Sequence, residues 1–171
     1  RKTGQEATVD FYPLTYVYPS QYALFLDDIK RHEAPWICKP VGGSQGQGIV
    51  FVTNENEAAQ FNNKTQAKIN ACETPEDKQR LTYVLQRYIP NPLLVGGRKF
   101  DIRTLSFQPL VVYIYRGGFC RFSSQPFTMK NFGNREIHLT NIAVQTHSTA
   151  YNPRHGCKWD TYSLRAYISN L

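Results

Sequence analysis

The sequence of 171 residues predicts an α+β protein whose sheets are mainly antiparallel. Short runs rich in β-branched and aromatic residues are separated by glycine- or proline-containing turns, which is typical of strands joined by hairpins. Longer segments carry apolar residues at helical spacing, and the regular strand–helix alternation of a parallel sheet is missing. The hydrophobic and charged fractions, 41% and 19%, are typical of a globular protein rather than a disordered one.

The first half of the chain is predicted to form a sheet with helices. Ser20 is a candidate N-cap for the first helix, which Pro35 ends. Two apolar runs flank the glycine-rich turn from Gly42 to Gly48, and this arrangement predicts a hairpin. In order, the predicted elements are an extended segment (11–18), a helix with Tyr22, Phe25, Leu26 and Ile29 on one face, strands 36–40 and 49–52, a helix (56–69) and a polar surface loop (71–81).

The second half is predicted to consist mainly of strands. Pro90 and Pro92 stop the first of them, and glycine pairs at 96–97 and 117–118 mark turns. Asp160 is a candidate N-cap for a final helix. In order, the predicted elements are strands 83–89, 99–105, 110–115 and 119–123, and a helix with Tyr162, Leu164, Tyr167 and Ile168 as candidate core residues.

Charge and cysteine content narrow the range of partners and sites. The net charge of +7 favours an anionic partner: nucleotide phosphates, nucleic acid or an acidic protein tail. No run of about 18 apolar residues exists, so we expect no transmembrane helix and no membrane partner. The pair His155 and Cys157 offers too few ligands for a metal, so no metal-binding residue is assigned. Wide spacing without a C-x-x-C pair favours buried free thiols in a reducing cytosol, at Cys38, Cys72, Cys120 and Cys157.

The glycine-rich turn does not match the common phosphate-binding motifs. Gly43 and Gly48 have the spacing of a P-loop, but Ile49 stands where that motif needs lysine. The turn also leads into a strand rather than a helix, so it is not a dinucleotide-binding turn. It could still fold over phosphates, because glycines let backbone N–H groups approach closely. An ordinary hairpin is an equally good interpretation.

Several charged residues interrupt apolar strand patterns. Lys39, Lys99, Arg103 and Arg121 each lie within such a run, where a buried cation would need an anionic partner. Asp101 is two residues from both Lys99 and Arg103, so the period of a strand would place all three on one face. This pattern favours a phosphate or nucleotide site over a solvent-facing stripe of ion pairs.

Four segments, in the right order, resemble the tubulin tyrosine ligase-like family. They are Phe11 to Tyr22 with its TYVYPSQY, Trp36 to Val52 (WICKPVGGSQGQGIVFV), Leu85 to Asp101 (LQRYIPNPLLVGGRKFD) and His138 to Gln145 (HLTNIAVQ). The segment Gly156 to Trp159 is most similar to the glutamylase branch of the family, which is associated with cilia and basal bodies. Together these segments cover most of the chain.

The resemblance implies an ATP-grasp fold, in which ATP is held between two α+β lobes. Residues 1–85 would form the central lobe, and residues 86–171 the first part of the C-terminal lobe. Arg103 and Arg121 would be catalytic and face phosphate or the substrate carboxylate, and the hinge at 86–89 would read adenine through backbone groups. The implied ATP-binding residues are Lys39, Gln45, Gly46, Gln47, Gly48, Ile49, Gln86, Arg87, Tyr88, Ile89, Lys99, Asp101, Thr140 and Asn141, and the implied substrate-binding residues are Arg121 and Thr146.

The implied reaction is the ATP- and Mg²⁺-dependent ligation of free glutamate to glutamate side chains of tubulin through an acyl phosphate. The implied partners are microtubules with acidic tails and possible accessory subunits, without nucleic acid. The implied location is the cytoplasm and cytoskeleton, in a cilium, flagellum or basal body. Glycylase or tyrosine ligase activity is an alternative. An RNA-binding module fits the charge and the aromatic content, but no RNP-type strand motif is present.

Some positions depart from the family pattern. Gln47 replaces a basic residue, Thr146 replaces a lysine near the incoming amino acid, and the stretch from Asp101 to Tyr113 is a few residues short. The family's N-terminal domain and acidic Mg²⁺ ligands are not found, which suggests a partial chain. These departures favour a second alternative, a non-catalytic tubulin-binding homologue. Because Asp101 alone is a poor Mg²⁺ site, we expect residues 1–171 by themselves to be inactive in ligation.

Overall fold

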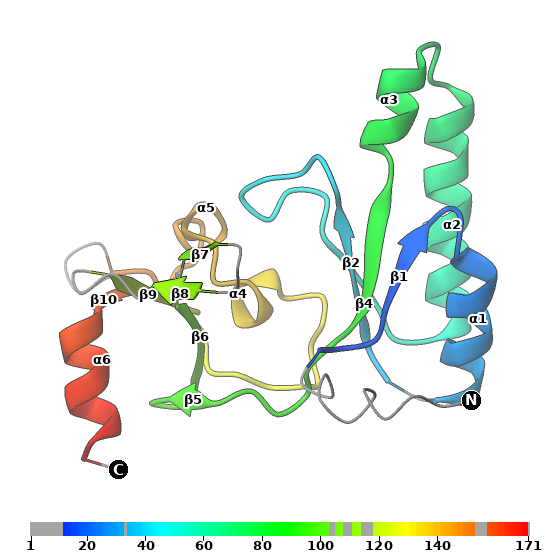
Figure 1. Ribbon diagram of the computed structural model, residues 1–171. Coiled ribbons are helices and arrows are strands. Elements are labelled where there is room, and N and C mark those ends of the chain that lie inside the picture. Colours follow the sequence, from blue (N-terminus) through cyan, green and yellow to red (C-terminus); the bar gives the residue numbers. More distant parts are fainter. Residues whose placement is uncertain are drawn as a thin grey trace. The chain divides into compact units, whose positions relative to one another are not determined.

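The computed structural model describes residues 12–32, 34–102, 105–107, 111–113, 118–152 and 157–170 (Figure 1). The chain divides into two compact units, Arg1–Pro90 and Asn91–Leu171. All strand pairs among the described residues are antiparallel, which confirms the predicted mixture of helices and mainly antiparallel sheets. The assignment of lobes to residues 1–85 and 86–171 stays a prediction. Within the described part, no helix is both long and apolar enough to cross a membrane.

The first unit is a four-stranded sheet with two helices packed on one face (Figure 1). The strand order is β1-β4-β2-β3, so the strand that is third along the chain lies at one edge and the first lies at the other. The elements are β1 (Thr15–Tyr18), α1 (Tyr22–Arg31), β2 (Trp36–Pro40), β3 (Val50–Val52), α2 (Glu55–Asn70), α3 (Pro75–Arg80) and β4 (Tyr83–Arg87).

The core of the first unit follows from the alternation along its strands. Trp36 and Cys38 of β2 are fully buried, as is Leu85 of β4, and these side chains share the face that the helices cover. Phe25 of α1 meets the Trp36 ring edge to face, with 5.1 Å between ring centroids. Phe61 of α2 is buried on the same side. The opposite face carries the alternate residues, which include the lysine of β2.

The second unit is built on another four-stranded antiparallel sheet, with the order β10-β9-β6-β5. Its core contains Val95, Cys120, Phe122, Cys157 and Leu164, and the half-buried Trp159 ring packs against Phe122 at a ring-centroid distance of 4.8 Å and an interplanar angle of 49°. The elements are β5 (Leu94–Val95), β6 (Arg98–Ile102), the antiparallel pair β7 (Leu105–Phe107) and β8 (Val111–Tyr113), β9 (Phe119–Phe122), α4 (Arg135–His138), α5 (Ile142–Gln145), β10 (Lys158–Asp160) and α6 (Thr161–Ile168).

The prediction of Ser20 as the N-cap of the first helix is wrong. The helix begins at Tyr22, Gln21 is the cap residue, and no side chain caps it. The Ser20 hydroxyl instead donates to the Val17 carbonyl oxygen at 3.3 Å, and the Gln21 amide oxygen accepts from the Val17 N–H at 2.8 Å. These local bonds close the turn before the helix, so the serine oxygen is not used as a cap.

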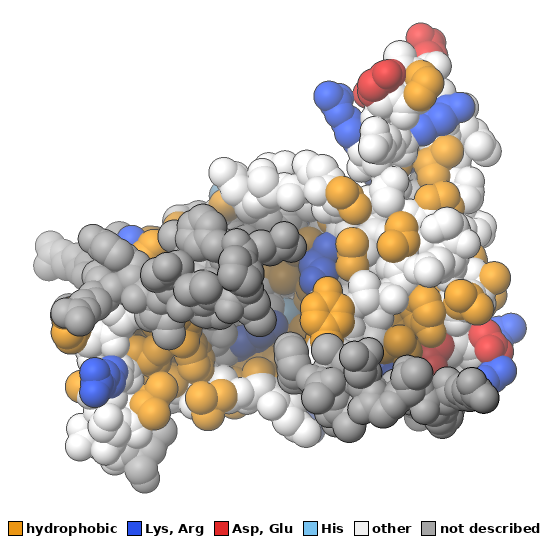
Figure 2. All heavy atoms as spheres, viewed as in Figure 1, with side chains coloured by type: hydrophobic (Ala, Val, Ile, Leu, Met, Phe, Trp, Pro, Cys, Tyr) orange, Lys and Arg blue, Asp and Glu red, His pale blue; other side chains and the backbone are white. Residues whose placement is uncertain are grey.

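The prediction of a loop at 71–81 is also wrong, because α3 occupies most of it. Thr74 caps this helix by accepting a hydrogen bond from the Asp77 N–H at 3.2 Å, and Pro75 stands at the first helical position. Both are strong helix-start signals. None of the residues of α3 is buried, so the polar, surface character of this segment was predicted correctly. Charged side chains gather over α3 at the top of Figure 2.

The predictions for the final helix are confirmed in part, and those for the cysteines mostly hold. Asp160 caps α6 as predicted, through a 2.6 Å hydrogen bond from the Ser163 N–H. Leu164 is buried and Tyr167 is half-buried, but Tyr162 and Ile168 are exposed rather than in the core. The cysteines are free, with Cys38, Cys120 and Cys157 buried and Cys72 partly exposed. Burial raises the pKa of the Cys38 thiol to about 12, which makes it inert.

We predict that Leu85→Ala lowers the free energy of unfolding by about 2–5 kcal/mol, because it removes a fully buried side chain and leaves a cavity beside its register partner Cys38. Leu24→Ala in α1 is the matched control, since that leucine is 58% exposed. Urea unfolding of both variants measures the difference. Equal destabilisation by the two substitutions would show that Leu85 does not belong to the core.

Candidate functional site

A hydrogen-bonded row of polar side chains crosses the sheet face that lies opposite the helices of the first unit. The Lys39 ammonium donates to the Gln86 amide oxygen at 2.7 Å, and the Gln86 amide nitrogen donates to the Thr15 hydroxyl oxygen at 3.0 Å. The Thr15 hydroxyl donates in turn to the Pro13 carbonyl oxygen at 2.7 Å. The strand register explains the row, because Gln86 pairs with both Thr15 and Ile37, which is two residues before Lys39.

Lys39 is the one charged group in this row. Burial lowers the pKa of its ammonium. Among the described residues Lys39 has no ion pair, so its charge is met by a neutral amide oxygen. A half-buried cation of this kind would gain more from an anionic ligand than an exposed lysine would. This geometry agrees with the predicted anion-binding role of Lys39.

The glycine-rich loop between β2 and β3 has a tightly constrained backbone. Gln45, Gly46 and Gly48 have positive φ angles of 56°, 79° and 71°. For Gln45 this conformation is uncommon and costs free energy. A Cβ atom at Gly43 would lie 2.6 Å from the Pro40 Cγ, so only glycine fits there. Gln45 and Gln47 are exposed, which leaves the loop accessible to a ligand.

The segment after β4 was predicted to read adenine through backbone groups. The Arg87 and Tyr88 N–H groups are engaged within the unit, by the carbonyl oxygens of Leu14 and Pro35, each at 2.8 Å. The Arg87 side chain lies on the helix-covered face, where it pairs with Asp28 at 2.8 Å. Tyr88 is buried, which raises the pKa of its phenol, and Ile89 is exposed. The predicted role of this segment stays a prediction.

In the second unit, Asp101 and Arg121 form a two-bond ion pair across β6 and β9. They are direct partners in the strand register. Arg121 Nε donates to one carboxylate oxygen at 2.9 Å, and a terminal guanidinium nitrogen donates to the other at 2.5 Å. The side chains are 32% and 14% exposed, so water screens the pair only partly. The pair orients the arginine and occupies both oxygens of the aspartate.

Lys99, on the same strand as Asp101, is positioned by the backbone of α4. Its ammonium donates to the His138 carbonyl oxygen at 2.9 Å. The His138 ring is buried, stacked on Phe132 at a centroid distance of 4.7 Å, and one ring nitrogen lies 2.9 Å from the Asn131 carbonyl oxygen. Burial lowers the pKa of His138, which favours a neutral ring beside the lysine.

Gln145, for which no role is predicted from the sequence, is fully buried. Its amide nitrogen donates to the carbonyl oxygens of Glu136, at 3.0 Å, and Leu139, and its amide oxygen accepts from the Ser124 N–H at 2.6 Å. Gln145 thus fastens α5 to α4 and to the end of β9. A buried glutamine needs several hydrogen-bond partners, and here the backbone supplies them. In the sequence, only the position of Gln145 at the end of the segment from His138 to Gln145 pointed to it.

The remaining predicted residues of the second unit lie close to this glutamine in the chain. Thr140 is buried between α4 and α5, and Asn141 is the cap residue of α5 without a side-chain cap bond. Thr146 is exposed, and its hydroxyl donates to the Ala143 carbonyl oxygen at 3.4 Å. Arg103 lies outside the described residues.

The structure thus joins Lys39 with Gln86 in one unit, and Asp101 with Arg121 in the other. Among the described residues, no group of three or more histidine, cysteine or acidic side chains could hold a metal ion. His155, half of the pair considered as metal ligands, is outside them.

A family model described as "Tubulin-tyrosine ligase family" matches residues 1–171. The chain belongs to the tubulin-tyrosine ligase family. This confirms the resemblance noted in the sequence. "Probable alpha-tubulin polyglutamylase Ttll1" of Tetrahymena thermophila is 40% identical over 98% of this chain and 41% of that protein. "Probable tubulin polyglutamylase TTLL9" of Rattus norvegicus is 34% identical over 97% of this chain and 42% of that protein.

A more distant relative is the "Tubulin polyglutamylase TTLL5" of Homo sapiens, 31% identical over 91% of this chain and 12% of that protein. The chain spans about two fifths of the length of the Tetrahymena and rat family members.

We predict that Asp101 and Arg121 stabilise the second unit as a coupled pair. A double-mutant cycle with Asp101→Asn and Arg121→Gln should give a coupling energy of about 1–3 kcal/mol in urea unfolding. The control cycle uses Asp77 and Arg80, a pair 49% and 77% exposed, for which we expect about 0–1 kcal/mol. A coupling no larger than that of the control would contradict the geometry.

Proposed function

We propose that the protein uses ATP to ligate glutamate to glutamate side chains of tubulin. The observation that carries this proposal is the identity of 40% to a protein named as a probable α-tubulin polyglutamylase, over 98% of this chain. Other similar family members, at 34% and 31% identity, also carry polyglutamylase names. The basic charge of the chain, +7, suits a substrate with acidic tails.

In this proposal the sheet face of the first unit binds the nucleotide. Lys39 contacts the phosphates, and the loop from Gln45 to Ile49 covers them. Support comes from the half-buried ammonium without an ion pair among the described residues, and from the glycine backbone that keeps this loop close to β2. Gln86 orients Lys39. The family resemblance also implies Lys99, Thr140 and Asn141 as ATP-binding residues.

The proposed reaction has two steps. An oxygen of the tubulin glutamate carboxylate attacks the γ-phosphorus, the bond to the β-phosphate oxygen breaks, and ADP leaves. The amine of free glutamate then attacks the acyl carbon, phosphate leaves, and the nitrogen loses a proton to give an isopeptide bond. Arg121 and Arg103 are proposed to stabilise the negative charge that builds up on the oxygens.

The described residues do not form a magnesium site. Both oxygens of Asp101 accept hydrogen bonds from Arg121, and no cluster of acidic groups is present among the described residues. Mg²⁺ normally binds carboxylates together with phosphate oxygens. The family resemblance implies Mg²⁺, but the described residues of this chain do not supply its ligands.

Glycine or tyrosine remain alternative donors, and a non-catalytic tubulin-binding role is a further alternative. The non-catalytic role is favoured by Gln47 and Thr146. Both are exposed, uncharged side chains at positions where the family pattern has basic residues. Action on tubulin would place the protein in the cytoplasm and cytoskeleton. We also propose that the protein is located in a cilium or basal body. Accessory subunits are a further part of the proposal.

We predict that Lys39→Ala weakens ATP binding about tenfold to a hundredfold, because it removes a charge-assisted contact worth about 1.5–3 kcal/mol. Lys78→Ala on α3, an exposed lysine away from the sheet face, is the control. Isothermal titration of the full-length protein and both variants measures the affinities, and thermal unfolding checks that Lys39→Ala is folded. Unchanged affinity in Lys39→Ala would remove this residue from the site.

We predict that the full-length protein incorporates labelled glutamate into microtubules with ATP, and that protease removal of the acidic tails abolishes both incorporation and salt-sensitive co-sedimentation. Labelled glycine and tyrosine, supplied in parallel, distinguish the donor alternatives. Binding to tailed microtubules without incorporation of any donor would favour the non-catalytic role. Equal binding to tailless microtubules would reject the tail as the target.

A further inference from the structure

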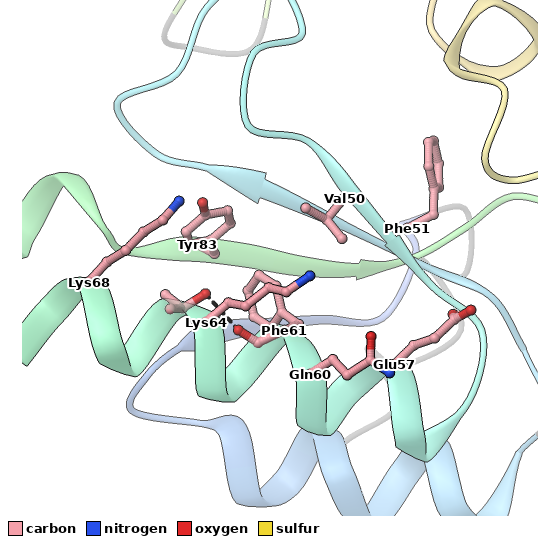
Figure 3. A pocket seen from close by; sticks show the side chains of 9 residues that line it. Val50, Phe51, Glu57, Gln60, Phe61, Lys64, Lys68 and Tyr83 are labelled. Atoms are coloured by element: carbon pink, nitrogen blue, oxygen red, sulfur yellow. Dashed lines mark hydrogen bonds between the residues drawn. The ribbon is translucent and has the colours of Figure 1, made fainter.

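A groove runs along the first unit between α2 and the edge strand β3 (Figure 3). Its volume is about 310 Å³. Phe61 and Thr65 of α2 and Tyr83 of β4 are buried and form its floor. Val50 of β3 is exposed at the edge. The groove lies on the helix side of the sheet, whereas Lys39 lies on the opposite face, so it is separate from the proposed nucleotide site.

Two lysines give this groove a positive charge. Lys64 and Lys68 are exposed, line the groove and rise from the same side of α2 (Figure 3). They are one helical turn apart, a spacing at which like charges repel each other. Neither has an ion pair among the described residues. Placing both there costs helix stability, which an anionic partner would recover.

The one acidic side chain that lines the groove is already engaged. A Glu57 carboxylate oxygen accepts hydrogen bonds from the Thr53 N–H at 2.7 Å and from the Thr53 hydroxyl at 2.8 Å. These bonds hold Glu57 at the start of α2, where its charge favours the helix N-terminus. The lysine end of the groove is therefore left without a compensating charge from the lining residues.

The other wall of the groove is an edge strand. β3 pairs with β2 on one side only and ends the sheet among the described residues. Such an edge presents backbone groups to which an extended segment can add as a further strand. A strand added there would run beside α2, with every second side chain directed toward the helix.

The spacing of the two lysines matches that of a strand. Residues one turn apart on a helix are separated by about 6.0 Å along its axis. Residues i and i+2 of a strand are about 6.8 Å apart on the same face. Two acidic side chains at i and i+2 of an added strand can therefore each meet one lysine.

We propose that this groove binds an extended acidic segment of a partner protein, which adds to the edge of β3 and places carboxylates at alternate positions against Lys64 and Lys68. Apolar or small side chains further along the same face of the added strand rest near Val50, which lies on the helix side of β3. The proposal goes beyond the ligase function and does not depend on it, because groove binding requires neither ATP nor the residues of the opposite sheet face.

The test measures peptide binding to the full-length protein by fluorescence anisotropy without nucleotide. The probe is a labelled peptide of alternating glutamate and threonine, and the variant is Lys64→Gln/Lys68→Gln. Lys78→Gln/Lys130→Gln is the matched control, because it removes the same charge from exposed positions outside the groove. We expect the groove variant to bind about three- to thirtyfold more weakly and the control to bind nearly as the wild type does.

Two further probes test the geometry. A peptide with only two glutamates at i and i+2 should bind more tightly than an isomer with them at i and i+3, because the latter places them on opposite faces of a strand. N-methylation of alternate backbone nitrogens should weaken binding by blocking strand addition. Both variants are exposed substitutions, and thermal unfolding checks that they are folded.

Several results would overturn the proposal. Equal losses in the groove and control variants would mean that only the net charge matters. Equal binding of the two isomers or of the N-methylated peptide would exclude an added strand. Displacement of the peptide by inorganic phosphate at matched ionic strength, with phosphate itself binding in a Lys64- and Lys68-dependent manner, would indicate a small-anion site instead. Self-association that depends on the two lysines would indicate a second copy as the occupant.

Discussion

The position of β4 constrains everything else in the first unit. It lies between β1 and β2 and pairs with both, so its alternation sets the character of both sheet faces. Leu85 points toward the helices and is fully buried, whereas Gln86 points the other way and receives the lysine of β2. A shift of the β4 register by one residue would bury the glutamine under α1 and expose the leucine. One strand thus determines both the apolar core and the polar row.

The parts of the fold that the sequence predicted well are those with a strong apolar pattern. The runs around Trp36 and Leu85 are short, apolar and bounded by turn residues, and both are strands. The helix at 75–80 was missed because its residues after Pro75 are all charged or polar, so it has no apolar periodicity and is held by its cap. Tyr162 and Ile168 have the spacing of a buried face, but the short α6 buries only the stripe around Leu164.

The sequence predicted individual residues of the candidate site, but not the contacts between them. The sequence identified Lys39, Asp101 and Arg121 as charges within strands, yet Lys39 and its partner are 47 positions apart, and Asp101 and Arg121 are 20 positions apart. Only strand pairing brings such positions together, and pairing registers depend on the whole sheet. The ion pair also changes the chemistry of Asp101, since a carboxylate with both oxygens bound to a guanidinium is a poor additional ligand.

The Thr15 hydroxyl determines which atom of the Gln86 amide faces Lys39, where a ligand would bind. Its proton is committed to the Pro13 carbonyl oxygen, so its own oxygen can only accept, and the Gln86 amide must present its nitrogen to Thr15. The amide oxygen is thereby directed at Lys39 before any ligand arrives. The main chain at Pro13 therefore preorganises the side chain of Gln86 on the neighbouring strand, and a ligand arriving at Lys39 need not lose entropy in selecting the amide rotamer.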